Sequence, residues 1–283
     1  MLAYITWTAD PVAFTIPFIQ WEVRWYGIAF ALGFMLGSWI VLKIWQHEKL
    51  NEEWYDKLFF YVIISATIGA RLGHCLFYAP EYYLAHPMEM FKIWEGGLAS
   101  HGGTLGIIIA VWIYSKKVTR KSMLWTFDRL VVPVGFVAAL IRLGNLMNHE
   151  IYGHATNMSW GFKFIENLGY VHHRGAPSIF SAPSHPTQLY EAFFYILTGL
   201  ICLWMYWKRE DYKYQGLIFG VFMIGIFLSR FFVEFFKNVQ ESFEENMLLN
   251  MGQLLSIPFV IVGCWFAYKG LKERKAALAK KIK

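Results

Sequence analysis

The sequence predicts an all-α integral membrane protein, with seven transmembrane helices and a small extracytoplasmic head domain between spans 4 and 5. Two observations favour this class. Apolar residues make up 57% of the 283 residues and charged residues only 16%, against about 25% charged residues in ordinary soluble domains. The chain also holds 13 Trp, 16 Tyr and 25 Phe, and aromatic rings gather at membrane interfaces. The composition disfavours an ordinary soluble enzyme and excludes a disordered chain.

Seven segments are long and apolar enough to cross a bilayer, since a hydrocarbon core about 30 Å thick needs roughly 20 apolar residues per helix. Their apolar residues cover nearly all faces, which is typical of helices surrounded by lipid. The predicted spans are 25–45, 57–79, 97–115, 124–147, 188–207, 216–236 and 248–268.

These spans divide the chain into five regions. The connection between spans 4 and 5 is too long for a tight turn, which indicates a small folded head or a mobile lid. The regions are an outer-surface interfacial segment (1–24), spans 1 to 4 (25–147), the extracytoplasmic head (148–187), spans 5 to 7 (188–268) and a basic cytoplasmic tail (269–283).

The basic residues predict the orientation of the spans. The net charge is +6, and 17 of the 26 Lys and Arg residues follow spans 1, 3, 5 and 7, with five on the opposite side and four inside spans. By the positive-inside rule, the N-terminus is extracytoplasmic and the C-terminus cytoplasmic. The positive charge thus serves orientation, or contact with anionic lipid of the inner leaflet, and no nucleic-acid partner is expected.

Polar side chains of six spans lie at one depth, in the outer leaflet, if each helix rises by about 1.5 Å per residue. Ionisable residues are costly inside a membrane and are therefore candidate site residues. The polar residues predicted at this depth are Tyr26, Arg71, His101, Arg142, Asn145, His185, Gln188, Tyr190, Glu191, Arg230 and Glu234, with Asn148, His149 and Glu150 just after span 4.

The three arginines of this layer need anions, and two interpretations are open. Structural ion pairs are one: Arg230 and Glu234 are i,i+4 neighbours on one helix face, and Arg71 could pair with Glu150 or Glu191. A phospholipid phosphate, which arginine binds bidentately, is the other. The phosphate is favoured most at Arg142, because Asn145 follows one turn later on the same face.

His101 stands in the glycine-rich segment 96–106, at the start of span 3. A single histidine in an apolar protein is often a hydrogen-bonded structural residue. The flanking glycines, however, permit close approach of a ligand, and helix N-termini attract anions. A histidine near phosphate-binding arginines could therefore act as a general base.

Several segments together resemble the prolipoprotein diacylglyceryl transferases of bacteria. The resemblance follows the family's order from span 1 to span 6 and covers nearly the whole chain. Four positions depart from the usual pattern: Ile141, Leu146, Ile226 and Lys237 stand where glycine, phenylalanine, tyrosine and arginine are common. The matching segments are Trp25-Tyr26-Gly27, His101-Gly102-Gly103, Arg142 through Glu150, His185 through Glu191, and Arg230 through Glu234.

The resemblance implies a reaction and its partners. A diacylglyceryl group moves from phosphatidylglycerol to the thiol of the lipobox cysteine in the signal peptide of a preprolipoprotein. A thioether forms and glycerol phosphate leaves, as the first step of lipoprotein maturation. The site would lie in the outer leaflet of the bacterial plasma (inner) membrane. No cofactor and no metal is expected, because arginine can stabilise the leaving phosphate and the sequence shows no metal-ligand cluster. The nucleophile belongs to the substrate, so no cysteine of this chain need be catalytic.

The resemblance also suggests a role for each candidate residue. Arg142 and Arg230 would hold the phosphate as catalytic residues, and His101 would take the thiol proton or orient the group that does. Glutamates would hold the arginines in place, and Gly153 would favour a close turn into the head. The substrate-binding residues would be Tyr26, Arg71, Asn145, Asn148, Glu150, Gly153, His185, Glu191 and Glu234.

Three rival classes fit the pattern less well. A phospholipid flippase should show polar residues at both leaflets and often a repeated half. A proton-coupled transporter would need carboxylates that cross the midplane. A non-catalytic scaffold would not need Arg, His and Asn from several helices at one depth.

Overall fold

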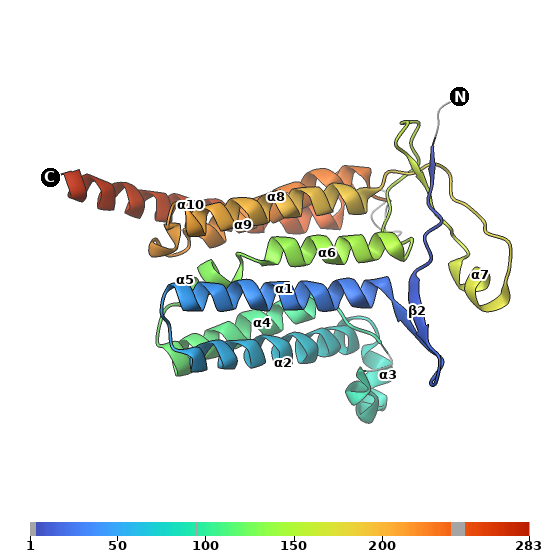
Figure 1. Ribbon diagram of the computed structural model, residues 1–283, viewed down its shortest axis with the longest axis horizontal. Coiled ribbons are helices and arrows are strands. Elements are labelled where there is room, and N and C mark those ends of the chain that lie inside the picture. The colour runs from blue at the N-terminus through green and yellow to red at the C-terminus, as the bar shows by residue number, and fades with distance from the viewer. Residues whose placement is uncertain (1–3, 94–95, 239–246, 283) are drawn as a thin grey trace. The chain divides into compact units, whose positions relative to one another are not determined.

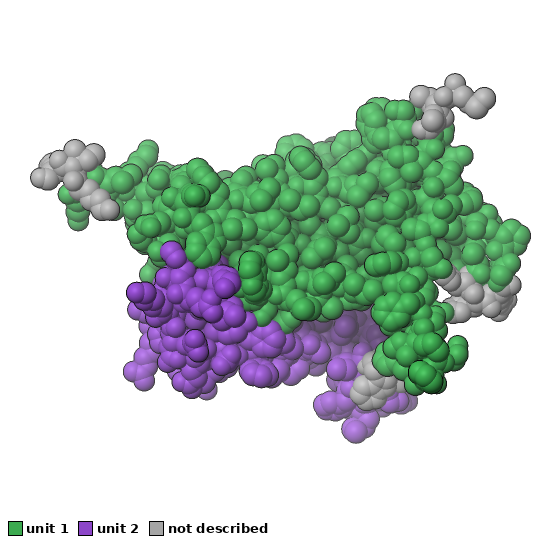
Figure 2. All heavy atoms as spheres, in the orientation of Figure 1, with its two compact units in different colours: residues 1–40, 130–283 green, residues 41–129 purple. Residues whose placement is uncertain are grey.

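The computed structural model describes residues 4–93, 96–238 and 247–282. The chain divides into two compact units, which Figure 2 shows in different colours. One unit contains residues 1–40 and 130–283, and the other contains residues 41–129. The following paragraphs describe each unit separately.

Short strands at the start of the chain belong to the first unit. β2 (Val12–Ile16) and β3 (Trp21–Arg24) form an antiparallel hairpin, and β1 (Ile5–Thr6) pairs in parallel with β4 (Phe162–Lys163). β-branched and aromatic side chains of the first 24 residues favour strands. The expectation of an all-α chain is therefore corrected to a mainly helical one, because this segment forms short strands that pair with each other and with residues after α6. The interfacial position of residues 1–24 remains a prediction.

The segment 148–187 folds together with the N-terminal strands. Buried Leu146, Phe162 and Phe164 form a small hydrophobic core, against which Trp7 packs. The indole nitrogen of Trp7 donates a hydrogen bond to the carbonyl of Leu146 (3.0 Å). This region also contains the short helix α7 (Leu168–Arg174).

The first unit also contains most of the long helices (Figure 1). They are the first part of α1 (Trp25–His47), then α6 (Val134–Met147), α8 (Thr187–Trp207), α9 (Leu217–Val233) and α10 (Met251–Ile282). α8 packs between α6 and α9, and α9 packs against α10. α6 and α8 approach closely at Gly135, where an added Cβ would lie 2.8 Å from the backbone nitrogen of Gly199, as is common between membrane helices.

The second unit is built around two helices, α2 (Glu52–Phe77) and α4 (Ser100–Tyr114). Their backbones meet at glycines, since a Cβ added to Gly73 would lie 2.7 Å from Cα of Gly102. The short segments of the unit are α3 (Pro80–Ala85), η1 (Pro87–Phe91), the π-helical turn η3 (Ser115–Thr119) and most of α5 (Met123–Leu130).

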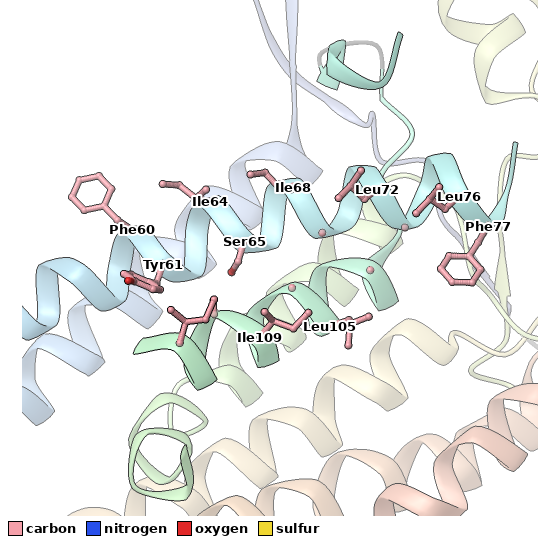
Figure 3. Close-up of a pocket in the computed structure, with 16 residues that line it drawn as sticks. Phe60, Tyr61, Ile64, Ser65, Ile68, Leu72, Leu76, Phe77, Leu105 and Ile109 are labelled. Carbon is pink, nitrogen blue, oxygen red and sulfur yellow. The ribbon is translucent and has the colours of Figure 1, made fainter. Parts of the chain in front are cut away.

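An apolar groove runs along α2 and α4 (Figure 3). Its volume is about 730 Å³, and Ile64, Ile68, Leu72 and Leu105 lie along its sides. These side chains are exposed in the protein. Such a surface suits hydrocarbon chains of a lipid bilayer and agrees with a membrane protein.

Five helices in the described part of the chain are long and apolar enough to span a membrane: α1, α2, α8, α9 with the 3₁₀ turn η5 (Glu234–Phe236), and α10. α5 and α6, separated by a short break, would together make a sixth. The predicted third span, 97–115, forms the 15-residue helix α4, because Gly96 and Gly97 have left-handed backbone angles (φ +87° and +69°) that keep them out of the helix. A multi-pass helical membrane protein is confirmed, and the count of seven remains a prediction.

Candidate active site

Arg142 lies near the end of α6, where Glu191 of α8 holds its guanidinium group. Nε of Arg142 is 2.8 Å from Oε2 of Glu191, and Nη1 donates to Oδ1 of Asn145 at 3.3 Å. The side chain of Glu191 is completely buried, whereas 17% of the Arg142 side chain stays exposed. The guanidinium group is thus fixed along one edge and partly open to a ligand.

Glu191 also binds a second cation, Lys237. Nζ of Lys237 lies 2.9 Å from Oε1 of Glu191 and 3.5 Å from Oε2 of Glu234. The ion pair predicted between Arg230 and Glu234 does not form between these two described residues. The reason is local: α9 ends at Val233, and Glu234 begins the 3₁₀ turn η5, which directs its carboxylate to the residue three positions later.

In the described part of the chain, no carboxylate lies within ion-pair distance of Arg230. Its charge acts on the hydroxyl group of Tyr195, which also interacts with the guanidinium of Arg142. The same hydroxyl lies 3.4 Å from Oε1 of Glu191. Tyr195 is buried, and Ile226 packs against its hydrophobic cluster. A single buried phenol therefore interacts with both arginines.

The turn after α6 presents Glu150 to two asparagines. Oε1 of Glu150 accepts hydrogen bonds from Nδ2 of Asn145 (2.8 Å) and from Nδ2 of Asn148 (3.1 Å). His149 and Ile151, on either side, have left-handed backbone angles (φ +56° and +60°), which cost on the order of 1 kcal/mol each in non-glycine residues. This backbone keeps Glu150 close to the arginine layer.

Tyr26, the second residue of α1, packs directly on α6. A Cβ added to Gly144 would lie 2.9 Å from Cδ2 of Tyr26 and 3.2 Å from its Cα. The absence of a side chain at Gly144 therefore admits the phenol. The charges of Glu150 and Arg142 both act on the hydroxyl group of Tyr26, so the tyrosine belongs to the same network.

Gly153 and His185 lie together in the segment 148–187. The amide of Gly153 donates to the carbonyl of His185 (2.8 Å), and a Cβ on Gly153 would clash with the carbonyl of Phe236. Nδ1 of His185 lies 3.1 Å from the hydroxyl of Tyr190. Burial, and in second place the neighbouring His154, lowers the pKa of His185. The imidazole is therefore neutral at physiological pH.

In the second unit, Arg71 is buried and bonded to backbone carbonyl groups. Nε donates to Met90 (2.9 Å), Nη1 to Gly96 (2.6 Å) and Nη2 to Glu89 (2.6 Å). All three nitrogen atoms of the guanidinium group are engaged. This arrangement favours a structural role for Arg71, in which it fixes the segment that leads to α4.

His101 is exposed in the first turn of α4. Its ring contacts Phe77 and Tyr78, with centroid distances of 5.5 and 5.9 Å. Phe77 lines the apolar groove of Figure 3, and so does Gly102, the residue that follows His101. The imidazole thus lies at the end of a surface suited to hydrocarbon chains.

Three further buried residues belong to this region. Gln188 was predicted only as a member of the polar layer, and Tyr195 and Lys237 were not predicted as site residues. Lys237 binds Glu191, Tyr195 interacts with Arg142, and the side-chain amide of Gln188 donates to the carbonyl of Glu150 (2.6 Å). A signal for two of them existed, because positions 188, 191 and 195 share one face of α8. For Lys237, the sequence showed only the departure from a common arginine.

The chain is similar, over most of its length, to proteins of one family. A family model described as prolipoprotein diacylglyceryl transferase matches residues 11–269. Relatives named phosphatidylglycerol--prolipoprotein diacylglyceryl transferase are 54% identical in Porphyromonas gingivalis and 43% identical in Chloroherpeton thalassium, each alignment covering 96% of both chains. A third, from Tolumonas auensis, is 41% identical over 95% of this chain and 98% of its own. The chain belongs to the prolipoprotein diacylglyceryl transferase family.

Proposed function

We propose that this protein transfers a diacylglyceryl group from phosphatidylglycerol to the lipobox cysteine thiol of a preprolipoprotein, the first step of lipoprotein maturation. Family membership supports the reaction, and the cluster of arginines supports the site. The observation that carries the site proposal concerns Arg230. This cation has no carboxylate within ion-pair distance in the described part of the chain, and it acts on the same tyrosine hydroxyl, that of Tyr195, as Arg142 does.

The proposed step exchanges one bond for another. The cysteine sulfur forms a bond to the glycerol carbon that carries the phosphate ester, and the carbon–oxygen bond to the phosphate breaks. Glycerol phosphate leaves with the bonding electrons, and the thiol proton goes to a base. Since the thiolate is the reactive form of a thiol whose pKa is near 8.5, a base or nearby positive charge accelerates the step.

The charge balance suggests different tasks for the two arginines. In the described part of the chain, Glu191 and Glu234 pair with Arg142 and Lys237, and Glu150 is held by two asparagines. Arg230 is thus left as a cation without a carboxylate within ion-pair distance. Arg230 would therefore bind the phosphate ionically and stabilise the charge that develops on the leaving group. Arg142, held by its Nε edge, would orient the phosphate through its remaining donors.

The other predicted residues would complete the pocket. His101 would accept the thiol proton, and Tyr26, Asn145 and Glu150 would position the headgroup. Glu191 would hold Arg142, and Glu234 would hold Lys237 instead of the arginine first expected. Asn148 would orient Glu150, Gly153 and His185 would join the head to the span region, and Arg71 would fix the backbone before His101 without touching substrate.

We further propose that the protein lies in the bacterial plasma membrane with its N-terminus outside and its C-terminus in the cytoplasm. The uneven distribution of Lys and Arg between the ends of the spans supports this orientation. The active site would then open to the outer leaflet, where the signal peptide of an exported precursor arrives. Phosphatidylglycerol, the precursor and surrounding lipid would be the partners, without nucleic acid.

A transfer assay tests the proposal. Proteoliposomes with phosphatidylglycerol are incubated with a lipobox peptide, and a mass gain of one diacylglyceryl group is expected. Arg230→Gln should lower kcat/KM by about 10²–10³-fold, whereas Arg120→Gln, a control at an exposed turn, should not change it. No mass gain would refute the reaction, and an active Arg230→Gln variant would refute the assignment of the phosphate. If His101→Gln stays near wild type while Arg142→Ala is inactive, the base is not His101.

A further inference from the structure

A second cavity, of about 490 Å³, lies in the 41–129 unit at the end of α4. The π-helical turn η3 and the start of α5 enclose it. Lys116, Arg120 and Lys121 line this cavity, which we call the basic pocket. It is separated from His101, at the start of α4, by the length of that helix, about 22 Å at 1.5 Å per residue. It is therefore distinct from the end of α4 that carries His101.

The basic pocket concentrates positive charge without an anion. Its lining contains no carboxylate, and in the described part of the chain none of its three cations forms an ion pair. Like charges that share one concave surface repel each other. The pocket is thus electrostatically complementary to a negatively charged group.

The backbone of the turn that carries these exposed cations has a defined conformation. Arg120 has a left-handed conformation (φ +55°), which is uncommon for a residue with a side chain. The turn is closed by the amide of Lys121, which donates to the hydroxyl of Thr119 (3.2 Å). The Ser115 hydroxyl, on the wall of the pocket, is buried and bonded to Thr126 (3.3 Å). The arrangement of the pocket is therefore set by the fold.

Besides the three cations and two serines, the pocket has apolar walls, and it lies at the end of an apolar helix. Trp112, half exposed, together with Met123 and Leu124 forms its other walls. α4 is an apolar helix that ends where the lysines begin, and tryptophan is enriched at the level of lipid headgroups. Apolar walls would not contribute to the binding of a free inorganic anion, whereas a phospholipid presents a phosphate and hydrocarbon chains side by side.

We propose that the basic pocket binds the headgroup of one anionic phospholipid, with Lys116, Arg120 and Lys121 around the phosphate and Trp112 against the first part of an acyl chain. With the orientation proposed above, this lipid belongs to the cytoplasmic leaflet, opposite the substrate. Basic pockets on that side of membrane proteins are suited to such headgroups. The lipid is a bound ligand of the fold and takes no part in the transfer.

The test counts bound phosphatidylserine by native mass spectrometry on full-length protein from phosphatidylcholine nanodiscs that contain a minor fraction of phosphatidylserine. This lipid is anionic without being the substrate. The variant Lys116→Gln/Arg120→Gln/Lys121→Gln should weaken binding of one phosphatidylserine by on the order of a hundredfold. The matched control Lys272→Gln/Lys275→Gln/Lys280→Gln removes the same charge from α10 and should retain that lipid.

A single variant guards against a failure of the triple variant to fold. Arg120→Gly suits the left-handed backbone and should weaken the same binding about fivefold. Equal loss in the pocket and control variants would show diffuse attraction and overturn the proposal, as would unchanged binding in both. Competition by inorganic phosphate at the concentration of the lipid would also overturn it, because the site would then recognise a free anion. The rate of diacylglyceryl transfer from phosphatidylglycerol should be the same in all these variants.

Discussion

Glu191 is the residue whose charge the candidate active site depends on most. Its side chain is completely buried and joins Arg142 (2.8 Å) to Lys237 (2.9 Å). Glu191→Gln keeps the shape and removes the charge, which leaves a buried lysine and a partly buried arginine without this partner. Loss of one partner of a buried ion pair costs about 3–5 kcal/mol. We expect the unfolding free energy to fall by about 3 kcal/mol, the lower end of this range. The loss is limited because Lys237 keeps Glu234 at 3.5 Å and part of Arg142 is hydrated.

The same substitution should also impair catalysis, because it frees the guanidinium edge that orients Arg142. We expect kcat/KM for diacylglyceryl transfer to fall at least about tenfold, which corresponds to about 1.4 kcal/mol. Unfolding is followed by tryptophan fluorescence in detergent, and transfer by peptide mass. A control, Glu48→Gln, removes the buried partner of Arg129 in the other unit. It should lower stability and leave kcat/KM of the folded protein unchanged.

A second substitution tests whether an unbalanced charge causes the loss. Adding Lys237→Met to Glu191→Gln restores the net charge of the wild-type cluster, because one anion and one cation are removed together. The double variant should recover stability relative to the sum of the single effects, by roughly 0.5–3 kcal/mol. Additive losses, or a Glu191→Gln protein with the stability and kcat/KM of wild type, would refute the reasoning.

Three further predictions follow from the same region. Tyr195→Phe removes the hydroxyl that interacts with both arginines and should lower kcat/KM about tenfold, while Tyr206→Phe, at a buried tyrosine further along the same helix, should leave it unchanged; equal effects would contradict a positioning role. Gly153→Ala should cost about 1–3 kcal/mol of unfolding free energy through overpacking, measured by thermal unfolding, and a wild-type melting temperature would contradict the close contact. Burial lowers the pKa of His185, so its contribution to stability is complete above about pH 6.5 and is lost as the pH falls through the lower pKa of the folded protein. His185→Gln should therefore reduce the pH dependence of the melting temperature between about pH 7 and about pH 5. An unchanged pH dependence would assign it to another group.

The sequence was most informative where a pattern depends on local physics. Apolar runs predicted α1, α2, α8, α9 and α10, because burial in lipid needs little beyond length and composition. The cost of ionisable groups in a membrane directed attention to Arg142 and Glu191, which the structure joins.

Two other features could not be predicted from local sequence patterns. The i,i+4 spacing of Arg230 and Glu234 holds only within an α-helix, and the helix ends between them. The pairing of β1 with β4 joins segments about 157 residues apart, such as Ile5 and Phe162, and no period or propensity encodes a partner at that separation. Long-range pairing and the geometry of helix ends are properties of the folded chain as a whole.

The contact of Gly252 with Glu234 has a consequence for how the site can be tuned. A Cβ at Gly252 would lie 2.5 Å from the carboxylate carbon of Glu234, so the bare backbone at the start of α10 covers that carboxylate and keeps water away from it. In a medium of low polarity a charge acts over a longer distance, and Glu234 acts electrostatically on Arg142 without touching it. A side chain at position 252 would displace the carboxylate and change the electric potential at the arginines. Phosphate affinity could thus be adjusted from α10 while every cation stays in place.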